Sequence, residues 1–201
     1  MNMQRRQWLT AMAALLCHSV PAASASANTP SVQPAWNASA PPVPDVRLLD
    51  HRGEPVALRP LLLQGPVAVN FFYTGCTSFC PPQTAIFRQL QALLGQEPAV
   101  NATLISLSID PLGDSPEAVA RFAAQYEARL GAQARWWMLT GSARHMQDIQ
   151  GVLRAFDVHA ASLAEHPAQV WIGHAARSRW LHSLGLASAE DMHRWLRAAA
   201  A

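Results

Sequence analysis

The feature that most limits the fold of this chain is a pair of cysteines, Cys76 and Cys80, placed between an apolar run and two prolines. The apolar run, residues 67–73, is typical of a buried strand, and Pro81 and Pro82 are typical of the first turn of a helix. A strand that delivers two thiols to a helix N-terminus is the arrangement of thioredoxin-like sites. The pair therefore predicts a thioredoxin-like α/β fold.

The position of the thiols also predicts reactive chemistry. The N–H groups and the positive end of the helix dipole stabilise a thiolate, which is both a nucleophile and a metal ligand. Three residues separate Cys76 from Cys80, one more than in a thioredoxin motif, so soft-metal binding competes with disulfide exchange. A purely structural disulfide is disfavoured, because it would close only a short loop in a domain of ample size. A stable Cu(I) site would need at least one further ligand.

Residues 1–27 are typical of a secretory signal peptide. Arg5 and Arg6 give a positive start, an apolar stretch follows, and residues 25–27 offer a small-residue cleavage site. The apolar stretch is shorter than the about 20 residues that span a bilayer, so we expect cleavage rather than a stable membrane span. Cys17 lies inside this stretch, and we interpret it as a bystander.

Beyond the predicted signal, residues 28–44 are rich in Pro, Ala and Ser and predict a flexible linker. Residues 45–201 are long enough for one thioredoxin-like domain with its own core. Two of the 15 basic residues and none of the 13 acidic ones lie in residues 1–27, so the remaining chain carries equal numbers of each sign. This balance argues against nucleic-acid binding, and export predicts a periplasmic protein in which disulfides can form.

Strand-like and helix-like segments alternate along the domain. In chain order we expect a hairpin of 46–49 and 56–58, a strand over 67–73, a helix over 82–94, a strand over 103–109, a helix over 115–130, a strand over 136–139, a helix over 142–156, a hairpin of 170–172 and 180–184, and a helix over 188–200. This order predicts an α/β thioredoxin-like sandwich with an N-terminal β-hairpin.

Seven histidines follow the predicted signal, and His166 differs from the others in its position. It stands just before the expected strand 170–172, and in a thioredoxin-like fold that approach brings the chain opposite the cysteine loop. A lone histidine is more often structural than a ligand, so position alone leaves both roles open. His145 and His193 lie among polar neighbours on expected helices, and we expect them to be solvated.

Asp110 ends the expected strand 103–109, at the same edge of the sheet as the cysteines. It is a candidate supporting residue that orients the ligands. The alternative is a simple turn into the next helix, with Asp114 or Ser115 as the helix cap.

Together these residues resemble the Sco/SenC family of thioredoxin-fold copper proteins. The first shared motif is an aromatic-rich strand followed by Thr-x-Cys-x-x-x-Cys-Pro, residues 71–81. The second is Ser-Ile-Asp-Pro followed by Asp-Ser-Pro-Glu, residues 108–117, and the third is an acidic residue and a histidine before a strand, Glu165-His166. The ordered set extends over about residues 45–200 and is more specific than any single motif.

The resemblance implies a copper site made of Cys76, Cys80 and His166, which holds Cu(I), Cu(II) or both. Two thiolates and an imidazole suit Cu(I) in a site from which another thiol can take the ion by ligand exchange. His159 and His174 are the alternative ligands if His166 is misplaced.

The resemblance further implies a periplasmic chaperone for the dinuclear copper site of cytochrome c oxidase. Its partner would be the copper-site subunit of the oxidase or another cuproprotein. The alternative is a thiol–disulfide reductase that acts on cuproprotein cysteines through redox-active Cys76 and Cys80, supplied by a thiol reductant. A metallochaperone is favoured over an enzyme. One departure from the family pattern is Pro167, which follows His166 where a Ser or Thr is more usual.

Overall fold

A five-stranded sheet with the order β5-β4-β3-β6-β7 forms the centre of the fold. The computed structural model describes residues 36, 39–159 and 162–201, so the predicted signal and most of the predicted linker lie outside the described residues. The described residues belong to one unit, Pro34–Ala201. The strands are β3 (Pro66–Phe72), β4 (Thr103–Ser108), β5 (Trp136–Leu139), β6 (Gln169–His174) and β7 (Arg179–Leu184).

The sheet is mixed, and its directions decide which residues meet at each end. Strands β3, β4 and β5 run parallel to one another, and β6 runs antiparallel to β3 and to β7. All seven residues of β3 are buried, which explains why the segment is apolar without interruption. The central strand that carries the thiols is therefore fixed on both sides.

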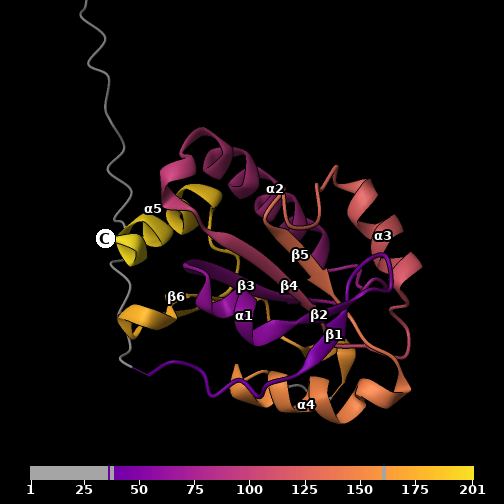
Figure 1. The fold of residues 1–201 in the computed structure, drawn as a ribbon. Coiled ribbons are helices and arrows are strands. Elements are labelled where there is room, and N and C mark those ends of the chain that lie inside the picture. The colour runs from indigo at the N-terminus through magenta and orange to yellow at the C-terminus, as the bar shows by residue number, and fades with distance from the viewer. Residues whose placement is uncertain (1–35, 37–38, 160–161) are drawn as a thin grey trace, which may run out of the picture. The chain divides into compact units, whose positions relative to one another are not determined.

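Helices cover both faces of the sheet (Figure 1). The helices on one face are α2 (Cys80–Gln96), α3 (Pro116–Gln125) and α5 (Ala189–Ala200), and those on the other are α1 (Leu58–Leu63) and α4 (Met146–Ala155). Side chains of β3 alternate between two apolar cores, with Ala68 and Phe72 in one and Val69 and Phe71 in the other. The architecture is the predicted α/β sandwich.

Proline and serine set the helix starts as the sequence indicates. Helix α2 begins at Cys80 with prolines in its first positions, so the thiol is the first residue of the helix. Ser115 caps α3 by accepting a hydrogen bond from the N–H of Ala118 at 3.2 Å. Ser188 caps α5 in the same way, accepting from Asp191 at 3.1 Å.

Some elements differ from the prediction by more than a residue or two at their ends. Helix α1 was not expected, because its six residues, with a proline among them, are too few to show a helical period. Helix α3 ends at Gln125 rather than near 130, because Glu127 adopts a left-handed φ of 54°. The segment 142–156 begins with a 3₁₀ turn, Ala143–His145, before α4.

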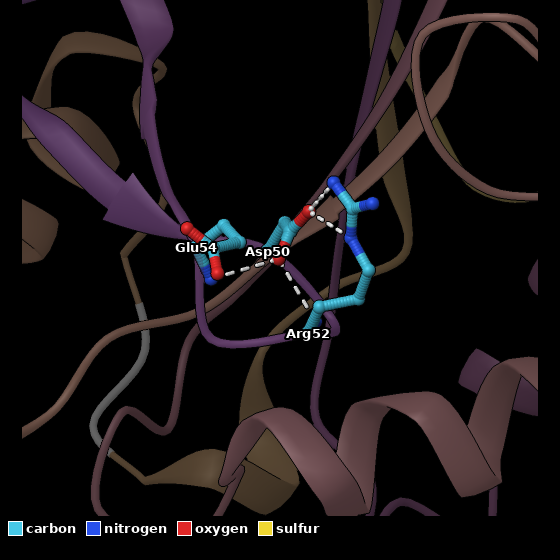
Figure 2. A network of polar contacts seen from close by, with 3 residues as sticks. All are labelled: Asp50, Arg52 and Glu54. Atoms are coloured by element: carbon cyan, nitrogen blue, oxygen red, sulfur yellow. Dashed lines mark hydrogen bonds and ion pairs between the residues drawn. The ribbon is translucent and has the colours of Figure 1, made fainter.

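The N-terminal hairpin, β1 (Arg47–Leu49) and β2 (Pro55–Ala57), is confirmed, and its turn is built on a buried aspartate. The Asp50 carboxylate accepts hydrogen bonds from the N–H groups of Arg52 (2.8 Å) and Glu54 (3.0 Å) and from the Arg52 guanidinium (Figure 2). Burial raises the pKa of Asp50, but these donors outweigh it and hold the pKa below its usual value. Leu49 also pairs with Thr140, which attaches the hairpin to the end of β5.

Candidate metal centre

The sheet topology brings the predicted site residues to one edge, which we call the thiol edge. Because β3 and β4 are parallel, the cysteine loop and Asp110 follow strands that end together, and the N–H of Ile109 donates to the carbonyl of Phe72 at 2.9 Å. Strand β6 is antiparallel to β3, with Asn70 opposite Val170, so the chain that enters β6 arrives beside the end of β3. His166 lies on that incoming segment.

The two thiols lie together under the start of α2. Cys80 has no exposed surface and Cys76 is 5% exposed. The N–H of Cys80 points at the sulfur of Cys76, with N···Sγ 3.4 Å, and the hydroxyl of Ser78 lies 3.6 Å from the same sulfur. The N–H of Cys76 donates to the carbonyl of Tyr73 at 3.2 Å, which closes the turn between strand and helix. Both cysteines are free thiols.

The surroundings shift the pKa values of the two thiols in opposite directions. Burial raises the pKa of Cys76, but hydrogen bonds from Cys80 and Ser78 outweigh it, so the net pKa is lowered. The pKa of Cys80 is raised, first by burial and then by its neighbour Cys76. Cys76 is therefore the thiol of the pair that loses its proton more easily, and Cys80 keeps its proton to higher pH.

His166 lies against two aromatic residues of the thiol loop, one that precedes Cys76 and one between the two cysteines. Its ring meets Phe79 edge-on at a centroid distance of 4.8 Å and Tyr73 at 6.2 Å. Only 1% of its surface is exposed, and burial lowers its pKa, so the imidazole is neutral near pH 7. The carbonyl of Pro167 lies 3.0 Å from Nδ1. Because a carbonyl can only accept, Nδ1 holds the proton in this contact.

The other ring nitrogen of His166 is the one available to a ligand. Nε2 is buried and has no hydrogen-bond partner among the described residues, although buried polar atoms are normally paired. A neutral imidazole with Nδ1–H on a backbone carbonyl and a lone pair on Nε2 has the form of a metal-ligating histidine. Two thiols and this nitrogen form a donor set suited to Cu(I).

The three candidate ligands are near one another but are not assembled around a point. Across residues 36, 39–159 and 162–201, no three His, Cys, Asp or Glu side chains are gathered closely enough to hold a metal ion. Binding by Cys76, Cys80 and His166 together therefore requires the imidazole to come closer to the two thiols.

Asp110 lies at the thiol edge as expected, within the turn after β4. Its carboxylate accepts from the N–H of Gly113 at 3.0 Å, and its own N–H donates to Ser108 Oγ at 3.1 Å. Burial, the two thiols and then Asp110 raise the pKa of Tyr73, so the Asp110 charge is felt beside the thiol loop. A side chain at Gly113 would collide with the Asp110 carboxylate, which explains the glycine there.

A buried aspartate next to this turn was missed as a site residue. Asp114 is 1% exposed and accepts hydrogen bonds from the N–H of Thr74 (2.8 Å), the hydroxyl of Thr74 (2.6 Å) and the hydroxyl of Ser108 (2.6 Å). The sequence signal was the second shared motif, which contains Asp114, but the residue was considered only as a helix cap. Ser115 provides the cap instead.

The alternative histidines lie elsewhere. His174 pairs with Pro66 at the start of β3, the opposite edge of the sheet from the thiols. His159 is exposed and pairs with Asp157 at 2.7 Å. The expected solvation of His193 is wrong, because its side chain is only 15% exposed and its Nε2 lies 3.5 Å from Glu97.

Comparison with known proteins shows which family the chain matches. The family model described as SCO1/SenC matches residues 37–179. The chain is 38% identical over 80 residues to a SCO1 protein homolog of Bacillus subtilis strain 168, and the aligned part is 39% of each protein. The alignment thus spans about two fifths of that relative's length.

Solved structures of similar proteins share the fold. One is BsSco, which is described as a member of the Sco family of cytochrome c oxidase assembly proteins with a disulfide switch. It matches with a TM-score of 0.61 at 24% identity, over 81% of this chain and 96% of the BsSco chain. Bradyrhizobium japonicum ScoI, solved with copper bound, matches with a TM-score of 0.61 at 19% identity, over 78% and 98% of the two chains. These similarities confirm the thioredoxin-like fold with its N-terminal hairpin. None of the helices in the described part of the chain has the length and apolar character needed to cross a bilayer.

Proposed function

This chain belongs to the SCO1/SenC family, and on that premise we propose that it is a periplasmic copper-binding chaperone for the dinuclear copper site of cytochrome c oxidase. A Sco-family relative is described as an oxidase assembly protein, and another was solved with copper bound. The proposal extends both properties to this chain through residues that match the family motifs. Its copper ligands are Cys76, Cys80 and His166.

The observation that carries the proposal is the unpaired Nε2 of His166. The other ring nitrogen, Nδ1, donates to the carbonyl of Pro167, and the ring contacts Tyr73, which precedes Cys76, and Phe79, which directly precedes Cys80. Leaving a buried nitrogen without a partner costs free energy, which a bound metal ion would return. The lowered pKa of His166 also reduces the competition between protons and copper for this nitrogen.

The thiol pair supports transfer as well as binding. Cys76 is the more exposed sulfur and the one with the lowered pKa, so it is the first to meet an incoming thiolate or copper ion. Copper moves by exchange of thiolate ligands, with one Cu–S bond forming on the partner as one breaks here, and no change in oxidation state. The oxidase copper-site subunit, or another cuproprotein, is the proposed recipient.

Anaerobic copper titration of the purified protein tests the ligand set. We expect one Cu(I) per chain, and loss of tight binding in Cys76→Ser and in Cys80→Ser, since each removes a soft anionic ligand. His166→Ala should weaken binding strongly and leave the fold intact. His159→Ala is the matched control and should bind like the parent. A His166→Ala protein with parental Cu(I) affinity would show that the proposed third ligand is wrong.

A thiol–disulfide reductase is the second candidate, and the opposite pKa shifts of the two cysteines favour it. A lowered pKa at Cys76 suits an attacking thiolate, and the protonated Cys80 would resolve the mixed disulfide. The partners would be cuproprotein cysteines and a thiol reductant. Oxidase activity at limiting copper separates the two functions in cells that carry His166→Ala or Cys76→Ser. Equal loss supports delivery, whereas near-normal activity of His166→Ala alone supports the reductase.

Export is part of the proposal and has its own test. Residues 1–27 are the proposed signal, so N-terminal sequencing of periplasmic material should find a mature chain that begins at or near Asn28. Intact Met1 in a membrane fraction would contradict both cleavage and the proposed location.

A further inference from the structure

Asp114 has an unusual position for an aspartate before a helix. Such residues normally cap the helix from the outside, where they meet solvent. Here Ser115 is the cap, so the Asp114 side chain is free to turn inward and reaches 1% exposure. Its backbone is also tied, since its N–H donates to the carbonyl of Asp110 at 2.9 Å and its carbonyl accepts from Thr140 Oγ1 at 2.7 Å.

The donors to the Asp114 carboxylate come from two segments of the thiol edge. Thr74 supplies both its N–H and its hydroxyl, and Ser108 at the end of β4 supplies the third donor. Thr74 lies inside the turn that the N–H of Cys76 closes onto Tyr73. One side chain therefore fixes the middle of the turn that places the first thiol.

Within the part of the chain that the structure describes, no cationic side chain forms an ion pair with this carboxylate. Its donors are all neutral. A buried carboxylate without a countercharge is an expensive way to stabilise a fold, because apolar packing would do so at lower cost. Its three donors instead give a directional anchor for the loop.

We propose that Asp114 is the positioning residue of the thiol loop, which holds Thr74 so that Cys76 stays buried beside Cys80 at the start of α2. For copper binding this rests on the proposed function, because a fixed Cys76 presents its sulfur to the ion that Cys80 and His166 share. For the thiol itself it does not depend on copper. Release of the anchor loosens the turn and exposes Cys76.

The test uses paired variants on the two sides of the anchor. Thr74→Val removes only the hydroxyl and keeps the shape, Thr74→Ser restores the hydroxyl, and Asp114→Asn removes the charge. Asp50→Asn is the matched control, since Asp50 is an equally buried aspartate that accepts N–H bonds in the hairpin turn. The first readout is the rate of iodoacetamide alkylation of Cys76 in the reduced, metal-free full chain, followed by mass spectrometry. The second is Cu(I) affinity in competition with a chromophoric chelator.

We expect Thr74→Val and Asp114→Asn to raise the Cys76 alkylation rate about 10-fold and to weaken Cu(I) binding 10- to 100-fold, on the order of the effects of residues that orient metal ligands. Thr74→Ser should stay near the parent in both. Asp50→Asn should lower the melting temperature without changing either readout.

Parental alkylation rates in folded Thr74→Val and Asp114→Asn would overturn the proposal. If Asp114→Asn does not fold, Thr74→Val decides alone. If the parent binds no Cu(I), the chaperone function fails, but the alkylation rates still decide the role of Asp114.

Discussion

The hairpin turn and the thiol edge each contain a buried aspartate, and the pKa values of the two carboxylates are shifted in opposite directions. Asp50 accepts two backbone N–H bonds and a guanidinium whose side chain is 64% exposed, and its pKa is lowered. Asp114 has protein around it and neutral donors only, and burial raises its pKa. Burial alone therefore does not fix the state of a carboxylate, because the number and charge of its donors decide it.

The contrast separates a structural region from a chemical one. The donors of Asp50 all come from the hairpin turn, whereas those of Asp114 come from two distant segments beside the thiols. Asp50, which has a charged partner and donors from its own turn, stabilises that turn. Asp114, which has only neutral donors, joins two segments that are distant in the sequence.

The largest expected effects come from disabling each region in turn. Cys80→Ser should weaken Cu(I) binding by more than about 100-fold, because it removes a thiolate ligand rather than a residue that orients one. Asp50→Ala should lower the free energy of unfolding by about 3 kcal/mol, since it leaves several buried donors unpaired, and should leave copper binding unchanged. Chelator competition and urea unfolding measure the two quantities. Copper loss in Asp50→Ala would break the separation.

The pH dependence of stability should have opposite signs for the two aspartates. The lowered pKa of Asp50 contributes stability that is present above its unfolded pKa of about 3.9 and is lost as the pH falls through the folded value. The raised pKa of Asp114 contributes stability that is present below about pH 3.9 and is lost as the pH rises through its folded value.

Urea unfolding between about pH 2.5 and 7 measures these slopes, with about 1.4 kcal/mol for each unit by which a pKa is displaced. Asp50→Asn should flatten the decrease in the free energy of unfolding that occurs as the pH falls. Asp114→Asn should remove the decrease in the free energy of unfolding that occurs as the pH rises. Equal slopes for both variants would contradict the opposite pKa shifts.

The turn glycines offer a smaller test of the same contrast. Gly53 in the hairpin has a φ of +80°, so Gly53→Ala should cost about 1 kcal/mol through backbone strain. Gly113→Ala should cost a similar amount by displacing the Asp110 carboxylate from the Gly113 N–H. Only Gly113→Ala should also change the phenol pKa of Tyr73, because Asp110 raises that pKa. Ultraviolet titration of the phenol measures it.

The smallest expected effect concerns the exposed guanidinium of the hairpin. Arg52→Met should lower the free energy of unfolding by about 0.5 kcal/mol, because an ion pair this exposed is largely screened. The pKa of Asp50 should rise but stay below that of Asp114, since the two backbone N–H bonds remain. Carboxyl titration by NMR measures both values. An Asp50 pKa above that of Asp114 would show that the guanidinium alone separates the two regions.

The parts of the fold that depend on local pattern could be predicted from the sequence, and so could the thiols. Strand β5 lies where it was expected, and α2 starts at Cys80, two residues before the expected start. The inward turn of Asp114 could not be predicted, because a capping position looks the same in sequence whether the side chain faces solvent or another segment. His193 was misjudged for the same reason, since its contact with Glu97 joins two distant segments. The ligand role of His166 stays a prediction.

Arg179 contacts residues near both ends of the described chain. Its guanidinium lies 4.8 Å from the ring centroid of Trp36 and donates to the carbonyl of Ala198 near the C-terminus. Arg179 begins β7 opposite His174, which lies across the sheet from the thiols. A surface coupling made near Trp36 or Ala198 would therefore lie at the end of the sheet opposite the cysteine loop. Immobilised protein should exchange metal with a dissolved partner as freely as protein in solution.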